Sequence, residues 1–250
     1  MTNTRFNPTP NGNLHLGHLY LILLNYHTAK ENNGKFIVRF DDEEGLVETL
    51  GIDKINRFCE EIKEDLSWMG IEPDLYSYES KEKEENERYL KQINIDVEEL
   101  KKPLKDLKNR ERDGIYPQIK NIERPHPYVP YLTAVKVVQD YREGCGILIR
   151  GDDLVSEFSL YCHLCKILNI PIPKFYFVPK LMQYKKEGSE DSLSDLTDVS
   201  KTEGNFKLRD LRKKGYSPKE IIEWLGNLCL IDKKKGWDYE NIKQRPTIYL

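Results

Sequence analysis

The sequence lacks any long hydrophobic run. Its apolar stretches fall well short of the roughly 20 residues that a bilayer-spanning helix needs. The first residues also lack the basic-then-apolar pattern of a secretory signal. We therefore expect a cytoplasmic protein without a membrane partner.

An excess of positive charge is also missing. Lys and Arg number 39 against 42 Asp and Glu, which gives a net charge of −3 at pH 7. Proteins that bind nucleic acid through many phosphates usually carry a basic face. We therefore expect no DNA partner, and any contact with RNA must come from a local basic segment.

Cysteine is scarce, with five residues in the chain and none in the segment 78–127. Cys162 and Cys165 have the spacing of zinc ligands, but they lie in an apolar helical pattern without a second ligand pair. We predict reduced thiols, no metal site and no structural zinc.

What the sequence does contain is an alternation of apolar strand and helix patterns. The run "KFIVRFDD" is typical of a parallel strand that is buried on both faces. The alternation predicts an α/β fold with a doubly wound parallel sheet. The predicted strands are 3–9, 35–42, 146–154 and 174–179, and the predicted helices are 15–32, 53–70 and 155–170.

We divide the chain into four regions. Residues 1–77 and 128–190 are expected to form the two halves of the core. The segment 78–127 is dense in both signs of charge, which favours solvated surface helices over a second core. Residues 191–250 are expected to hold a polar loop and two helices, the second capped by Ser217.

The first candidate site is the turn that leads into "HLGH", residues 15–18. A helix N-terminus attracts phosphate, and glycine at 17 leaves room for a flat ligand such as adenine. His15 and His18 face one side of the helix and can each donate to a phosphate oxygen. The same pattern is also typical of two structural histidines at a helix cap.

Two further groups are candidates. Ser200 and Lys201 lie in a polar, glycine-containing stretch, and a loop lysine can neutralise charge on a transferring group. Acids and arginines follow the predicted strands, where the ends of a parallel sheet bind ligands. Arginines there can clamp carboxylates, and acids can bind an ammonium or a ribose hydroxyl. These strand-end candidates could instead form a surface ion-pair network. They are Arg5, Asp41, Arg150, Asp152 and Asp153.

Residues 4–44 closely resemble the opening of glutamyl-tRNA synthetases, class I enzymes with a "HIGH"-type motif. The blocks "DLSWMGIEPD", "ILIRGDDLV" and "VSKTEGNFKLRDLRKKGYSPKEIIEWLGNLCL" are similar to later blocks of that family, in the same order. The last block stands where the family carries its "KMSKS"-type loop. The resemblance implies a Rossmann-like, HUP-type nucleotide-binding core with a short helical insertion and a helical C-terminal segment.

The resemblance also implies a reaction, in which an amino-acid carboxylate attacks the α-phosphorus of ATP-Mg²⁺ and releases pyrophosphate. It assigns catalytic roles to His15, His18 and Lys201. The implied ATP-binding residues are Thr9, His15, Gly17, His18, Asp153, Ser200 and Lys201. The implied amino-acid-binding residues are Arg5, Asn7, Thr9, Asp41, Leu132, Lys136 and Arg150. The two arginines favour an acidic substrate, and glutamate is the expected amino acid.

The chain departs from the family at several of these positions. Asp198 replaces the first lysine of the loop and Thr202 a basic residue, which should weaken transition-state stabilisation. Leu132 stands at the family's usual tyrosine and Lys136 near its asparagine, so the amino acid could differ from glutamate.

The architecture departs as well. The insertion 78–127 is much shorter than the family's acceptor-binding module, and no anticodon-binding domain is expected after Leu250. The chain thus resembles a truncated paralogue related to the glutamyl-queuosine-tRNA(Asp) synthetases, although these carry a cysteine-rich insertion. Three functions stay open at this point. They are amino-acid activation with transfer to tRNA, transfer of the amino acid or nucleotide to a small molecule or carrier, and an inactive binding or regulatory module.

Overall fold

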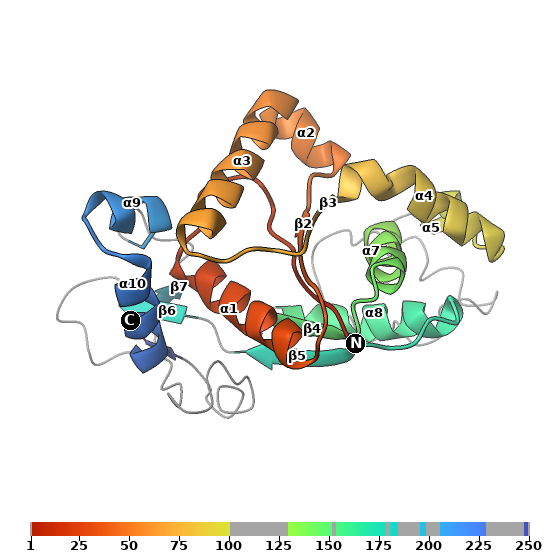
Figure 1. Ribbon diagram of the computed structural model, residues 1–250. Coiled ribbons are helices and arrows are strands. Elements are labelled where there is room, and N and C mark those ends of the chain that lie inside the picture. Colours follow the sequence, from red (N-terminus) through yellow and green to blue (C-terminus); the bar gives the residue numbers. More distant parts are fainter. Residues whose placement is uncertain are drawn as a thin grey trace. The chain divides into compact units, whose positions relative to one another are not determined.

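The computed structural model describes residues 2–100, 130–151, 154–178, 181–184, 196–198, 206–228 and 248–249. It falls into two compact units (Figure 1). The first comprises residues 1–80, 147–152 and 175–250, and the second comprises residues 81–146 and 153–174. Over the described part of the chain, no helix has the length and apolar character to cross a membrane.

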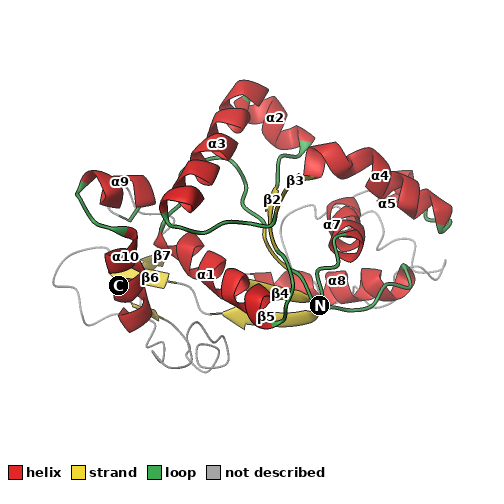
Figure 2. Ribbon diagram, viewed as in Figure 1, coloured by secondary structure: helices red, strands yellow, loops and turns green. Residues whose placement is uncertain are grey.

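The first unit is built on a parallel sheet. Strands β1 (Thr4–Phe6), β2 (Phe36–Phe40) and β3 (Leu75–Tyr78) pair in this order, and both pairs are parallel. Parallel neighbours require crossovers, which here contain α1 (Leu16–Glu31) and then α2 (Glu44–Leu50) and α3 (Ile52–Trp68) (Figure 2). The predicted α/β fold is confirmed.

Strand β4 (Ile147–Gly151) lies on the other side of β1. Its Ile147 N–H donates to the carbonyl of Asn3 at 3.4 Å, and β5 (Lys174–Val178) pairs with β4. The three-stranded sheet β3-β2-β1 thus lies beside the two-stranded sheet β4-β5, and the order β3-β2-β1-β4-β5 changes direction after β1 as in doubly wound folds. Helix α1 packs against β1, β2 and β4.

The core of the first unit lies between α1, α3 and the sheet. Apolar burial supplies most of the stabilisation of such a core. The middle strand also buries the charged side chain of Arg39 completely, which the apolar strand pattern did not predict. The most buried apolar side chains include Leu16, Leu19, Ile22, Leu24, Phe36, Val38, Phe40, Ile62 and Leu66.

The later part of the first unit adds a small sheet and two helices. Strands β6 (Leu181–Tyr184), β7 (Leu196–Asp198) and β8 (Ile248–Tyr249) pair in the order β7-β6-β8. Helices α9 (Leu208–Lys213) and α10 (Pro218–Leu228) lie between β7 and β8 in the chain. The Ser217 hydroxyl accepts from Glu220 N–H at 3.3 Å, and the Ser217 N–H donates to the Glu220 carboxylate at 2.8 Å, which confirms the predicted cap.

The second unit is helical, with α4 (Glu79–Gln92), α5 (Val97–Leu100), α7 (Pro130–Arg142) and α8 (Val155–Ile167). The prediction of wholly solvated helices after residue 78 is wrong for α4. Its Asn86 and Leu90 are buried, because Arg142 of α7 donates to Asn86 at 2.8 Å and to Glu82 at 3.1 Å. A packed face is therefore present within the charged segment.

The described cysteines lie mostly in the interior of the protein. Cys59, Cys145 and Cys165 are buried and Cys162 is half-buried, and none of these four described cysteines is in a disulfide. Burial raises the pKa of Cys165 to about 12, so this thiol stays protonated at neutral pH. The described residues contain no group of three or more His, Cys, Asp or Glu side chains placed to hold a metal ion.

Candidate nucleotide and amino-acid site

The two predicted histidines form the cap of α1. His15 is the N-cap residue, and its Nδ1 accepts a hydrogen bond from the Gly17 N–H at 3.1 Å. The Nδ1 of His18 accepts from the His15 N–H at 3.4 Å, so the two imidazoles cap the helix reciprocally. A neutral imidazole whose Nδ1 accepts carries its proton on Nε2. Each neutral ring therefore has an Nε2–H donor.

The two rings also pack against each other. Their centroids lie 3.7 Å apart with the planes at 26°, and the edge of Phe6 contacts His18 with centroids 5.9 Å apart. Burial, with a smaller contribution from His15, lowers the pKa of His18 to about 3. His18 is therefore neutral at physiological pH and acts as a dipolar donor, not as a cation.

Glycine at 17 has a specific steric reason. A Cβ at this position would lie 3.0 Å from Cε1 and 3.1 Å from Nδ1 of His15. The sequence suggested that Gly17 leaves room for adenine, and in the structure the ring of His15 lies beside that space. The glycine is thus required by the close approach of its own cap residue.

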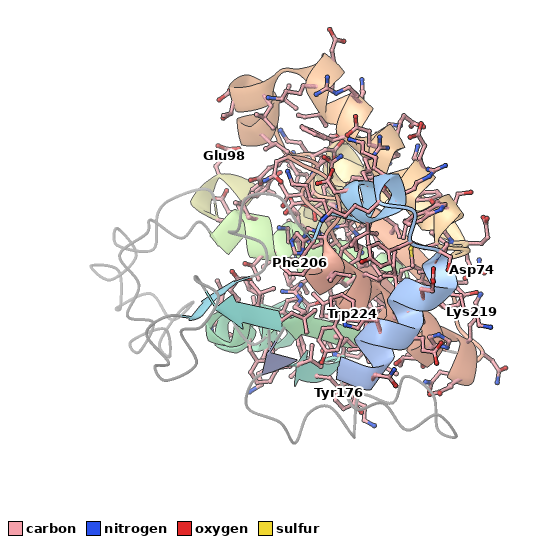
Figure 3. The ribbon with its side chains drawn as sticks, turned by 90° about the vertical axis from the view of Figure 1, so that its left-hand side faces the viewer. Asp74, Glu98, Tyr176, Phe206, Lys219 and Trp224 are labelled. Carbon is pink, nitrogen blue, oxygen red and sulfur yellow. The ribbon has the colours of Figure 1, made fainter. Side chains whose placement is uncertain are left out.

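A segment from the far end of the chain pairs with this cap. The Leu16 N–H donates to the carbonyl of Phe206 at 3.0 Å, and the Leu208 N–H donates to that of Leu14 at 2.9 Å. This antiparallel bridge joins His15 to Lys207. The ring of Phe206 also stacks on Trp224 of α10, with centroids 6.5 Å apart (Figure 3).

The bridge bears on the predicted loop. Ser200, Lys201 and Thr202 lie outside the described residues, as does Asp153. The described chain resumes at Phe206, whose carbonyl accepts from the Leu16 N–H in the helix that His15 caps.

The ends of the three parallel strands converge through side chains. Asn7 directly follows β1, and Glu79 directly follows β3. The Nδ2 of Asn7 donates to the Glu79 carboxylate at 3.1 Å. Between them, the Asp41 N–H donates to the carbonyl of Pro8 at 3.0 Å. The Oδ1 atom of Asn7 is buried and accepts no hydrogen bond from the residues that the structure describes. A buried acceptor of this kind is suited to a donor from a bound ligand.

The remaining predicted residues are spread over several elements. Arg5 is buried in β1, and Arg150 of β4 is half-buried, whereas Thr9 is exposed. Leu132 and Lys136 lie on α7 of the second unit, and both are half-buried. The first unit therefore brings together the residues at the ends of β1 and β2 and those at the start of α1.

Sequence reasoning missed two acids beside these strands. Glu79 is almost fully buried against Asn7. Asp42 is also buried, and its carboxylate accepts from Ser80 N–H at 2.9 Å and Ser80 Oγ at 2.6 Å. The pair "DD" at 41–42 marked this strand end, but only the tertiary contact shows that Asp42 holds the start of α4.

Comparison with known proteins shows what this chain is similar to. A family model described as tRNA synthetases class I (E and Q), catalytic domain, matches residues 1–96. Glutamate–tRNA ligase 1 of Helicobacter pylori (strain HPAG1) is 27% identical in an alignment that is 293 positions long, gaps included, and that covers 95% of this chain. The chain spans only 58% of the length of that ligase.

Solved structures show the same fold. The glutamate tRNA ligase from Elizabethkingia meningosepticum CCUG26117, in complex with its amino acid, has a TM-score of 0.63 at 18% identity. The glutamate-tRNA synthetase from Elizabethkingia anophelis has a TM-score of 0.65 at 18% identity. Each likeness covers 99% of this chain and 66% of the solved chain. The chain is thus similar, in the sequence of its first 96 residues and in its fold, to the catalytic domains of class I glutamyl-tRNA synthetases.

Proposed function

We propose that this protein uses ATP to activate an amino acid, with glutamate as the expected substrate. The observation that carries the proposal is the bridge between the histidine cap of α1 and the segment 206–208. A carboxylate oxygen of the amino acid attacks the α-phosphorus of ATP, and the bond to the β-phosphate breaks. The products are an aminoacyl-adenylate and pyrophosphate.

The protein's own contribution to this reaction is positioning and charge stabilisation. The Nε2–H groups of His15 and His18 donate to phosphate oxygens. Because His18 is neutral, the positive charge for the transition state must come from elsewhere, and Lys201 is the proposed source. Gly17 and Thr9 belong to the same ATP site, as do Ser200 and Asp153. Mg²⁺ enters with ATP as part of the substrate complex.

The amino-acid side is assigned to the strand ends. Arg5 and Arg150 bind carboxylate groups, which supports an acidic substrate. Asp41 binds the α-ammonium group, and the buried Oδ1 of Asn7 offers a second acceptor near it. Leu132 and Lys136 are proposed to shape the same specificity. The names of the Helicobacter and Elizabethkingia proteins, which are glutamate–tRNA ligases, also support glutamate.

The proposal has two forms, which differ in the molecule that accepts the activated amino acid. The names of the relatives favour tRNA, but the alignment with the Helicobacter ligase spans 293 residues and this chain has 250. The ligase therefore has internal segments without a counterpart here. The loss of such segments, together with the short charged insertion 78–127, favours a small molecule or a carrier as acceptor.

Amino-acid-dependent exchange of pyrophosphate into ATP tests the proposal. We expect exchange with glutamate among the twenty amino acids, measured both without and with tRNA because tRNA can be required for activation. Lys201→Ala should lower the rate at least about tenfold, while Lys219→Ala, an exposed lysine of α10, should not. Exchange without charging of tRNA would favour the small acceptor. No exchange in either arm would refute activation and favour a binding or regulatory module.

Gly17→Ala gives an independent test of the histidine cap. The new Cβ would displace the His15 ring and break its bond to the Gly17 N–H, so we expect about a tenfold loss of exchange. Alanine is the better helix former, so stability should change by less than about 1 kcal/mol. The exchange rate and thermal unfolding should be compared with those of Gly45→Ala in α2, where a Cβ has nothing within 4 Å. Wild-type exchange in Gly17→Ala would contradict this role of His15.

A further inference from the structure

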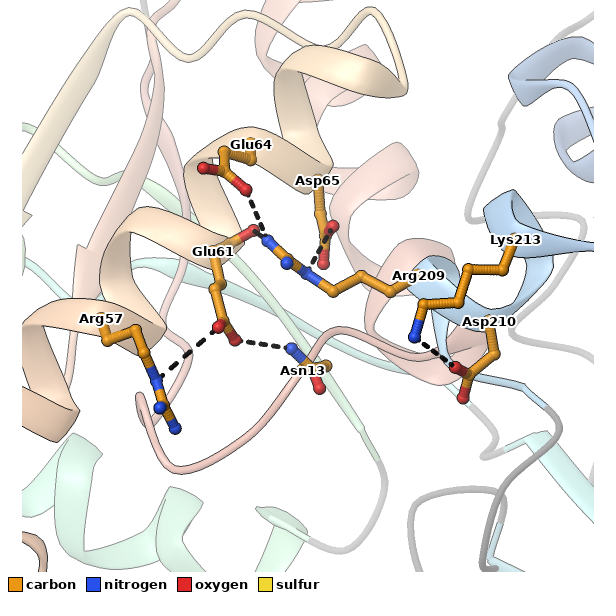
Figure 4. A network of polar contacts seen from close by, with 8 residues as sticks. All are labelled: Asn13, Arg57, Glu61, Glu64, Asp65, Arg209, Asp210 and Lys213. Carbon is orange, nitrogen blue, oxygen red and sulfur yellow. Dashed lines mark hydrogen bonds and ion pairs between the residues drawn. The ribbon is translucent and has the colours of Figure 1, made fainter.

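The contacts of Arg209 single it out among the side chains of α9. Its Nη2 donates to the carbonyl of Glu61 at 3.1 Å and to the carboxylate of Glu64 at 2.7 Å. Its Nε lies 3.3 Å from Oδ1 of Asp65, whose side chain is 1% exposed. One guanidinium fork thus engages three acceptors on a single turn of α3 (Figure 4).

The same turn of α3 also holds the residue next to the histidine cap. Oε2 of Glu61 accepts from Nδ2 of Asn13 at 2.8 Å, and Oε1 lies 3.7 Å from Nε of Arg57 (Figure 4). Asn13 directly precedes Leu14 and His15. Helix α3 therefore anchors both segments that form the bridge, one through Asn13 and the other through Arg209.

The bridge needs this external support. It consists of two backbone hydrogen bonds, and so short a pairing is marginal in water. Helix α9 spans only Leu208–Lys213, and isolated helices of this length are not stable. Arg212 adds a second tie, with its guanidinium 5.4 Å from the ring centre of Trp68 at the end of α3.

We propose that Arg209 is a positioning residue of the activation site. By fixing α9 to α3 it holds the segment 206–208 against the cap of α1, and so keeps His15 and His18 in place. The inference rests on the proposed function for its catalytic consequence, whereas its structural part does not depend on the activity.

The structural part is tested by hydrogen exchange on the full chain. Arg209→Met should lower the protection of the Leu16 and Leu208 amides at least about tenfold, because these amides make the bridge. The Val38 amide of β2 should keep its protection. Lys213→Met is the matched control, since Lys213 lies on the same helix, its Nζ is 3.8 Å from Oδ1 of Asp210 within that helix, and its side chain is 80% exposed. Unchanged Leu16 and Leu208 amides in Arg209→Met would overturn the proposal.

The catalytic part is tested by pyrophosphate exchange. Arg209→Met should lower kcat about tenfold and leave the KM for the amino acid within about twofold, because it loosens the segment that braces the histidine cap and leaves the strand ends in place. Arg209→Lys should fall between wild type and Met, since a lysine can reach Glu64 but cannot replace the fork. If kcat falls only as far as the loss of thermal stability explains, and Arg209→Lys recovers neither, then Arg209 is a purely structural residue.

Asn13→Ala supplies a second route to the same bridge, should Arg209→Met fold poorly. If both residues act through the bridge, the double variant Asn13→Ala/Arg209→Met should lose less activity than the two single losses multiplied. If the activity loss of the double variant equals the product of the two single losses, the shared mechanism is refuted. Absence of exchange in the wild-type protein would refute the proposed function alone, because the protection of Leu16 and Leu208 would still decide the role of Arg209.

Discussion

Replacing Gly34 by alanine is expected to destabilise the protein by about 3 kcal/mol or more. A Cβ at this position would overlap the backbone carbonyl of Thr2 and would lie 3.1 Å from the Asn3 nitrogen. Backbone atoms cannot give way as a flexible side chain can. The overlap would separate the two strands that begin here, where the Thr4 N–H donates to the carbonyl of Lys35 at 3.0 Å.

Urea denaturation measures this effect, with Gly45→Ala as the matched control. A Cβ at Gly45 meets nothing within 4 Å. Alanine in helix α2 should therefore leave stability unchanged or raise it by less than about 1 kcal/mol. If the Gly34 and Gly45 variants unfold at the same urea concentration, the result contradicts the close approach of Gly34 to the Thr2 carbonyl.

The second large effect is a pH dependence caused by Asp65. Burial raises the pKa of Asp65 from 3.8 to about 6, with Arg209 and then Arg212 opposing the shift and Glu61 and Glu64 adding to it. Between these two values the folded protein holds a proton that the unfolded chain has released. Raising the pH through this window therefore favours unfolding, by up to about 3 kcal/mol in total.

Comparison with Asp65→Asn isolates this contribution. Asparagine cannot ionise, so the wild-type protein should lose stability relative to the variant as the pH rises from about 4 to 6.5, and the difference should then level off. Urea denaturation of both proteins at several pH values measures it. Arg209→Met should move the loss to higher pH, because it removes the opposing cation. Parallel stability curves for wild type and Asp65→Asn would contradict the burial of this carboxyl.

Much of the first unit was predictable because its signals are local. The helix predicted at 15–32 spans Leu16–Glu31, and the one predicted at 53–70 spans Ile52–Trp68 and ends before Gly70, whose φ is +70°. The apolar spacing that predicts a helix lies within a few residues of sequence, and so does the glycine that ends it.

The side chains that α3 buries differ from its sequence pattern. The helical spacing of Ile55, Phe58, Ile62 and Leu66 predicts that Phe58 is buried, but Phe58 is half-buried and Cys59 is fully buried. A helical pattern alone does not distinguish two adjacent apolar residues near the edge of the buried face. The neighbouring elements decide which one is buried.

The parts of the site that were missed depend on distant partners. Asp41 and Asp42 are equivalent in the sequence, and only the contact with Ser80 separates the buried structural acid from its neighbour. A helix cap was one of the two interpretations of His15 and His18, but its reciprocal hydrogen bonds do not follow from helix-start preferences, because histidine is not among the usual N-cap residues. The burial of Glu79 follows from Asn7, far away in the chain.

The pairing of Leu14–Leu16 with Phe206–Leu208 has a consequence for biosynthesis. These segments are almost two hundred residues apart, so the loop closed by their bonds is among the longest that this chain can form, and such contacts come late in folding. The strands β1 and β2 and helix α1 emerge from the ribosome long before Phe206. An interrupted chain therefore contains both histidines without the segment that braces them, and completion of synthesis becomes a condition for assembling the cap in its final form.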